Sequence, residues 1–215
     1  MNVSFSISHG FVWFRVAKTG TRTLNQLLLQ AVSDYQYTTA ESCTQHQLDV
    51  IQGLISDGAF TFSMVRNPWS RLASAWENKI KRQRMIGKDG GRKALMRCTK
   101  LDRSIAAQTI LEADFEWFVD RLAGSRLFEE DVHFRLQSNI LRNVDLEYLG
   151  RFEQFEAHIV QILSHLDVRM PSKLPHKNKT AHSNESYRSY YNHRTRAIVA
   201  ELYGEDIRRF DYSFS

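Results

Sequence analysis

The chain has 215 residues, of which 42% are hydrophobic and 25% charged, with ten glycines and three prolines. This length can bury a full core and this composition is that of a folded protein, so a disulfide-built miniprotein and a disordered or fibrous chain are excluded. The net charge of +5 favours anionic partners such as nucleic acid, an anionic cofactor or an acidic glycan.

The first predicted element is a strand followed by a short turn and a helix. Phe11–Val16 is rich in aromatic and β-branched residues, as a buried strand should be. The turn is Lys18–Thr23, and apolar residues then follow at helical spacing, at Leu24, Leu27, Leu28 and Ala31. Because a helix start offers backbone N–H groups and a positive dipole end, Lys18 and the threonine hydroxyls of this turn predict an anion-binding loop.

A second strand, turn and helix is predicted at Phe60–Val65 and the residues after it. Asn67 suits the N-cap of the helix and Pro68 its first position. Arg66 then stands at the carboxyl end of a strand, where open α/β sheets bind their ligands. The two elements together predict an α/β fold with a P-loop-like, mainly parallel sheet flanked by helices.

The rest of the chain continues this alternation. Lys79–Lys100 is strongly basic and aperiodic, which predicts a surface excursion or lid. The remaining predicted elements are a helix over Phe115–Leu122, a strand over Tyr148–Phe152, a helix over Phe155–Leu166, a polar loop over Pro171–Ser186 and a helix around Ile198–Tyr203. No boundary divides the sequence, so residues 1–215 are expected to form a single domain.

Two features bear on location. Phe11–Ala17, the most apolar N-terminal stretch, is interrupted by Arg15 and is far too short for a membrane span or a secretory signal. The two cysteines, Cys43 and Cys98, are too few for a disulfide framework and predict thiols in a reducing compartment. We therefore expect a cytoplasmic protein without a membrane span.

The phosphate-sized turns differ from those of ordinary ATPases. Lys18 precedes the only glycine of its turn, so the turn is not a Walker A loop. The second strand ends in Arg66 and Asn67, where a P-loop enzyme often carries a magnesium-binding aspartate. A P-loop-type nucleotide kinase or NTPase stays as one alternative. A non-catalytic nucleic-acid-binding protein is the other, although the basic segment lacks interleaved aromatic residues, so no nucleic-acid partner is expected.

Two motifs stand out, KTGTRT at residues 18–23 and FSMVRNPWSRLAS at residues 62–74. They resemble the 5′-phosphosulfate loop and the 3′-phosphate motif of the carbohydrate sulfotransferases, Golgi-type and bacterial, with Arg66 and Ser74 at the family's spacing of eight residues. Ala17 and Asp211 depart from the family, which often has Pro and Gly there. The likeness spans nearly the whole chain and continues in Gln137–Asn139, Leu149–Glu153, Leu174–Asn178, Leu202–Asp206 and Phe210–Phe214.

The resemblance implies transfer of a sulfuryl group from 3′-phosphoadenosine 5′-phosphosulfate (PAPS) to a hydroxyl of a carbohydrate-type acceptor, with 3′-phosphoadenosine 5′-phosphate (PAP) as the product. An acidic acceptor would suit the basic segment, and the chemistry requires no metal. The 3′-phosphate is assigned to Arg66 and Ser74. The 5′-phosphosulfate is assigned to the whole first turn, namely Lys18, Thr19, Gly20, Thr21, Arg22 and Thr23.

The chemistry of these residues agrees with the assignments. Negative charge develops on the bridging oxygen as the S–O bond breaks, and Lys18 is placed to stabilise it. Arg66 offers paired planar donors for a phosphate. The acceptor hydroxyl also needs a base, for which His46 resembles the histidine that related sulfotransferases carry between the two motifs. His133 and Glu41 are the alternative bases.

Overall fold

The structure is a computed structural model and describes residues 2–81, 114–123, 125, 128–129, 131–171 and 186–214. The chain divides into two compact units. The first unit comprises Met1–Arg66 and Leu141–Lys179, and the second comprises Asn67–Ile140 and Thr180–Ser215. The single domain expected from the sequence stays a prediction.

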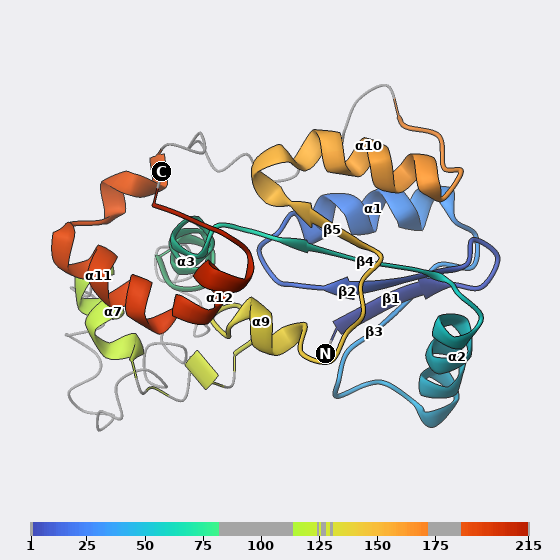
Figure 1. Cartoon of the computed structure of the whole chain (residues 1–215), viewed down its shortest axis with the longest axis horizontal. Helices are drawn as coiled ribbons and strands as arrows, with labels where there is room; N and C mark the ends of the chain where they lie inside the picture. The colour runs from blue at the N-terminus through green and yellow to red at the C-terminus, as the bar shows by residue number, and fades with distance from the viewer. Residues whose placement is uncertain are drawn as a thin grey trace. The chain divides into compact units, whose positions relative to one another are not determined.

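A five-stranded sheet forms the first unit, in the order β3-β1-β2-β4-β5 (Figure 1). Strands β2, β4 and β5 are parallel, whereas β1 runs antiparallel to both β2 and β3. The α/β fold is confirmed, but the sheet is mixed, because two strands that the sequence did not predict, β1 and β3, add antiparallel pairings. The bounds are β1 Asn2–Ser6, β2 Phe11–Arg15, β3 Gln36–Thr38, β4 Phe60–Val65 and β5 Tyr148–Arg151.

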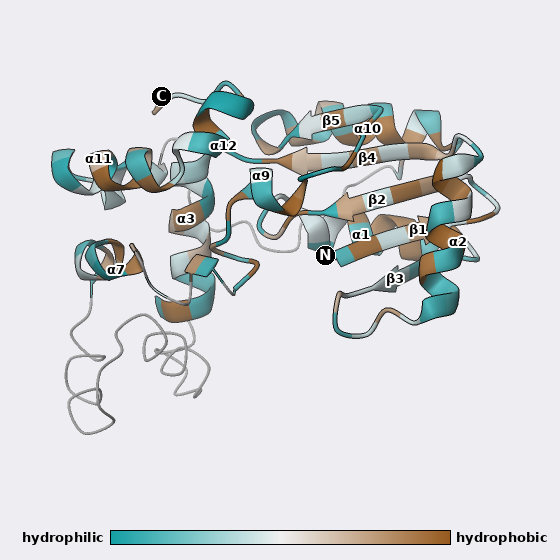
Figure 2. Ribbon diagram, turned by 60° about the horizontal axis from the view of Figure 1, so that its bottom comes forward, coloured by the Kyte–Doolittle hydropathy of each residue, from teal (hydrophilic) through white to brown (hydrophobic). Residues whose placement is uncertain are grey.

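The described residues of the first unit also form three helices, namely α1 (Thr21–Ala31), α2 (Gln45–Ser56) and α10 (Phe155–His165), the last preceded by the 3-10 turn η2 (Phe152–Gln154). Helices α1 and α10 lie on the same face of the sheet, and α2 lies beside the end at which β4 begins (Figure 1). Alternate residues of β2 and β4 share a core with α1 and α10, and these two strands are largely brown to white in the hydropathy view (Figure 2). The strand residues of this core include Phe11, Trp13, Phe60, Phe62 and Met64.

The described part of the second unit is helical. Asn67 caps its first helix, as predicted, because its side-chain oxygen accepts the backbone N–H groups of Trp69 and Ser70. The elements are α3 Pro68–Trp76, the π-helical turn η1 Glu77–Lys81, α7 Phe115–Leu122, α9 Gln137–Ile140, the 3-10 turn η3 Ser186–Tyr190, α11 His193–Leu202 and α12 Gly204–Arg209. The predicted helix Phe115–Leu122 thus has its expected bounds.

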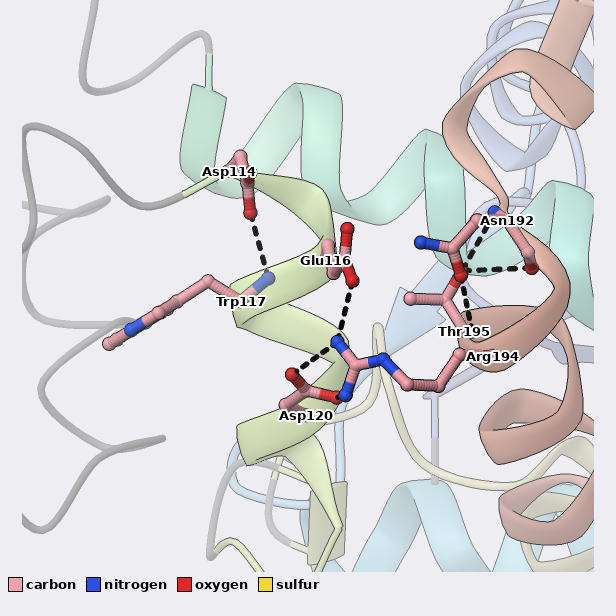
Figure 3. Close-up of polar contacts among 7 residues, drawn as sticks. All are labelled: Asp114, Glu116, Trp117, Asp120, Asn192, Arg194 and Thr195. Atoms are coloured by element: carbon pink, nitrogen blue, oxygen red, sulfur yellow. Dashed lines mark hydrogen bonds and ion pairs between the residues drawn. The ribbon is translucent and has the colours of Figure 1, made fainter.

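An exposed arginine joins α7 to α11 (Figure 3). Arg194 donates to both carboxylate oxygens of Asp120, at 2.7 and 2.8 Å, and to Glu116 at 2.6 Å. These bonds raise the pKa of Arg194 and lower that of Glu116. The two helices are also capped by their own sequence, α7 by Asp114 and α11 by Asn192. The contact therefore links α7 and α11 at their exposed surfaces.

Some sequence predictions lie outside the described residues. They include most of the basic segment, from residue 82 onward, and residues 172–185 of the polar loop with its Leu174–Asn178 motif. In the part of the chain that is described, none of the helices has the length and apolarity needed to cross a membrane.

Candidate functional site

The loop between β2 and α1 turns through two residues in the left-handed region, Lys18 with φ +74° and Gly20 with φ +80°. That conformation is free of strain for glycine, whereas it costs a side-chain-bearing residue about 1–2 kcal/mol. A Cβ at residue 20 would also lie 2.2 Å from Cε2 of Phe155. Gly20 is therefore required both by the turn and by its packing against α10.

The loop leads directly into the start of α1. Its N-cap is Gly20, so no side chain caps the helix, and its first turn carries no acidic residue. The first backbone N–H groups of a helix have no intrahelical acceptors. The positive end of the α1 dipole therefore lies at this loop, a place that favours negative charge.

The threonines of the loop take different positions. Thr19 is buried, and its hydroxyl donates to the carbonyl oxygen of Val16 at 2.8 Å, which holds the turn closed. Thr21 and Thr23 are half-buried and Arg22 is exposed. Binding of a ligand by each of these residues stays a prediction.

Arg66 follows β4 and reaches this loop. Its Nη1 donates to the carbonyl oxygen of Lys18 at 3.2 Å. Its guanidinium carbon also lies 4.2 Å from the centre of the Phe152 ring. Because β2 and β4 are parallel neighbours, their carboxyl ends meet at one edge of the sheet. The structure thus brings together the Lys18 loop and Arg66, which the sequence assigned to two ends of one ligand.

From the sequence we did not predict that two aromatic side chains would pack against this site. Phe152 stacks on Arg66, and Phe155 lies against Gly20. The neighbouring strand β5 ends in Arg151, which pairs with Val65 and adds a further cationic residue at the carboxyl edge. No local signal pointed to this contact, because the pairing of β4 with β5 brings Phe152 to Arg66.

Two predicted residues of the first unit stand apart from the loop. His46 is exposed in the first turn of α2, whose cap is a reciprocal pair of hydrogen bonds between Thr44 and Gln47. Glu41 is exposed in the connection from β3 to α2. In the described residues, the structure shows no hydrogen bond from either side chain to the loop, so their role as a base stays a prediction.

The other two candidates belong to the second unit. Ser74 is half-buried on α3. His133 forms a close pair with Asp131, with 2.7 Å between Nδ1 and Oδ1, and its backbone N–H donates to the same oxygen at 2.9 Å. Burial raises the pKa of the Asp131 carboxyl, but the hydrogen bonds from His133 outweigh it and lower that pKa below its usual value.

A buried arginine holds the turn that carries His133. Arg71 is 1% exposed, and its guanidinium donates to the carbonyl oxygens of Val132 and Arg135 at 2.9 and 2.8 Å. Nδ1 of His133 is committed to Asp131, so proton transfer at this residue would run through Nε2. His133 is therefore held by Asp131, whereas His46 is exposed.

We expect Gly20→Ala to destabilise the protein by about 2–4 kcal/mol, because it combines left-handed strain with overpacking against Phe155. Urea unfolding measures this loss. Gly53→Ala in α2 is the matched control, since nothing lies within 4 Å of its Cβ position. The control should gain about 0.5–1 kcal/mol from better helix propensity. A neutral Gly20→Ala would contradict the packing role of this glycine.

Of the comparisons with known proteins, the one with protein families found a match. The profile of the sulfotransferase family matches residues 2–213 and so covers both units. Comparisons with curated proteins and with solved structures gave no match.

Within the described ranges, no group of three or more His, Cys, Asp or Glu side chains is arranged to hold a metal ion.

Proposed function

The chain belongs to the sulfotransferase family, whose members transfer a sulfuryl group to a hydroxyl-bearing acceptor, and we propose that this protein uses PAPS as donor and a carbohydrate as acceptor. One observation carries the proposal, namely the hydrogen bond by which Arg66 reaches the Lys18 loop. It places a second cationic group beside an anion-binding helix start. PAPS is a donor with negative charge at two ends and so fits such a pair.

The residues present suit the 5′ end of PAPS. The uncapped start of α1 offers N–H groups, and Gly20 lets the ligand approach the backbone closely. PAPS, when bound, supplies the sulfuryl group that the acceptor hydroxyl takes as the S–O bond to the 5′-phosphate breaks. Lys18 then stabilises the negative charge on the bridging oxygen, and the helix dipole adds to this effect.

The 3′ end of the cofactor is assigned to Arg66 and Ser74. A guanidinium binds phosphate through paired planar N–H donors, and a serine hydroxyl donates one more hydrogen bond. Recognition at this end would distinguish PAPS from ATP, which has no 3′-phosphate. A P-loop-type kinase or NTPase would instead need magnesium, and a nucleic-acid-binding protein would show steep salt dependence without affinity for PAP.

The acceptor hydroxyl loses its proton to a base, for which we propose His46 on the family resemblance alone. His46 is exposed in the first turn of α2, which lies beside the end at which β4 begins, whereas the Lys18 loop and Arg66 follow the carboxyl ends of β2 and β4. A neutral imidazole is the usual base near neutral pH. The cytoplasmic location and the absence of a metal requirement remain predictions beside this assignment.

We expect PAP to raise the unfolding temperature of the protein without magnesium, and to do so more than ATP with or without magnesium. A ligand stabilises a protein only by binding its native state, so thermal shift measures this selectivity directly. Arg66→Ala should weaken PAP binding by about 1.5–3 kcal/mol, the scale of a hydrogen bond to a charged group.

The control for this experiment is Arg169→Ala, which removes an exposed arginine of the same unit and should leave PAP binding unchanged. Equal stabilisation by ATP and PAP would contradict the proposed cofactor. Equal weakening by both arginine variants would show that Arg66 acts only through the overall charge.

A further inference from the structure

Two phenylalanines, Phe152 in the turn before α10 and Phe155 at the start of α10, connect the two halves of the proposed cofactor site. The Arg66 guanidinium stacks on Phe152, and the rings of Phe152 and Phe155 lie 5.6 Å apart with a tilt of 52°. Phe155 in turn fills the space where a side chain at Gly20 would stand. An unbroken series of contacts thus runs from Arg66 through two aromatic rings to the phosphosulfate loop.

The stacking on Phe152 constrains an otherwise flexible side chain. A free arginine has many rotamers, and binding an anion with one geometry requires that this freedom be lost. A ring under the guanidinium restricts the rotamers of Arg66 before the ligand arrives. The bond from Nη1 to the carbonyl oxygen of Lys18 restricts them further. Arg66 is therefore held from two directions, by a ring and by a carbonyl.

We propose that Phe152 is a positioning residue for recognition of the 3′-phosphate, acting through Arg66. This inference rests on the proposed function, because it assumes that Arg66 binds that phosphate. Phe152 then determines how strongly the protein prefers PAP over adenosine 5′-phosphate (AMP), which lacks the 3′-phosphate. It has no such effect on the affinity for the 5′ end, which the Lys18 loop binds.

The test compares Phe152→Leu, which keeps an apolar side chain but removes the ring, with Phe152→Tyr, which keeps the ring. Calorimetry without magnesium measures the dissociation constants of PAP and AMP for each protein. Phe152→Leu should weaken PAP binding about threefold to thirtyfold, the range of a cation–π contact, and change AMP binding less than about twofold. Phe152→Tyr should retain the wild-type preference.

A double-mutant cycle adds a second readout. If Phe152 acts through Arg66, its replacement by leucine should have no further effect on PAP binding in an Arg66→Ala background. Additive losses in this cycle, or equal losses for PAP and AMP, would overturn the inference. Should Phe152→Leu fail to fold, Phe152→Met supplies the non-aromatic variant, with the same expected loss of selectivity.

The two proposals fail in different ways. Wild-type protein that binds PAP no more tightly than AMP would overturn the proposed recognition of the 3′-phosphate and this inference with it. A wild-type preference for PAP that survives intact in Phe152→Leu would overturn the inference alone.

Discussion

Lys18→Ala should lower the turnover number about a hundredfold or more while changing the affinity for PAP far less. The reason is that we propose the Lys18 ammonium to act where charge develops in the transition state, and removal of such a group lowers kcat in particular. Sulfuryl transfer from PAPS to a glycan or a surrogate hydroxyl measures the turnover, and PAP titration measures the affinity.

The backbone conformation of Lys18 supplies a matched control. The φ angle of residue 18 is +74°, which is strained for alanine as much as for lysine. Glycine adopts this angle without strain. Lys18→Gly should therefore lose as much turnover as Lys18→Ala and be more stable than it by about 1–2 kcal/mol. Weakened PAP binding with normal turnover in both variants would reassign Lys18 from catalysis to binding.

His46→Ala should lower turnover about a hundredfold to ten-thousandfold and leave PAP binding intact, because it removes the proposed base and no part of the cofactor site. The fall in wild-type activity on the acid side of the pH profile should disappear in this variant. Since His46 is exposed, the substitution should have little effect on the unfolding temperature.

His133→Ala is the comparison for this result. It breaks the pair with Asp131, so its unfolding temperature has to be measured along with its turnover. Near-normal turnover in His46→Ala with collapse in His133→Ala would transfer the role of base to His133. If neither variant loses turnover, Glu41→Gln is the next test.

The elements that flank the proposed site could be predicted because their local signals are strong. β4 is a continuous buried strand, and Asn67 with Pro68 marks the start of α3. The strand β1 was missed because Ser4 and Ser6 are fully buried in it. Ser4 accepts a hydrogen bond from Tyr35, which is distant in the sequence. A buried serine with such a partner cannot be recognised from the pattern of hydrophobic residues. The three-residue β3 is defined by its pairing alone.

In the candidate site, too, the features with a local sequence signal were predicted and those that depend on long-range pairing were not. The Lys18 loop and Arg66 were predicted because each follows a strand and precedes a helix. The stacking of Phe152 on Arg66 was not, because it depends on the pairing of Val65 with Arg151, two residues far apart in the sequence. Local patterns thus predict which cations reach the sheet edge, while the fold determines what holds them there.

The position of β5 in the chain has a consequence for the order of folding. β1 and β2 form a local hairpin, whereas Glu147, just before β5, donates to Thr61 at a separation of 86 residues. Because the entropic cost of closing a loop rises with its length, we expect β5 to join the sheet after the β1–β2 hairpin has formed. Phe152 follows β5 and arrives with it. We therefore expect the Lys18 loop to form before Arg66 gains its contact with Phe152.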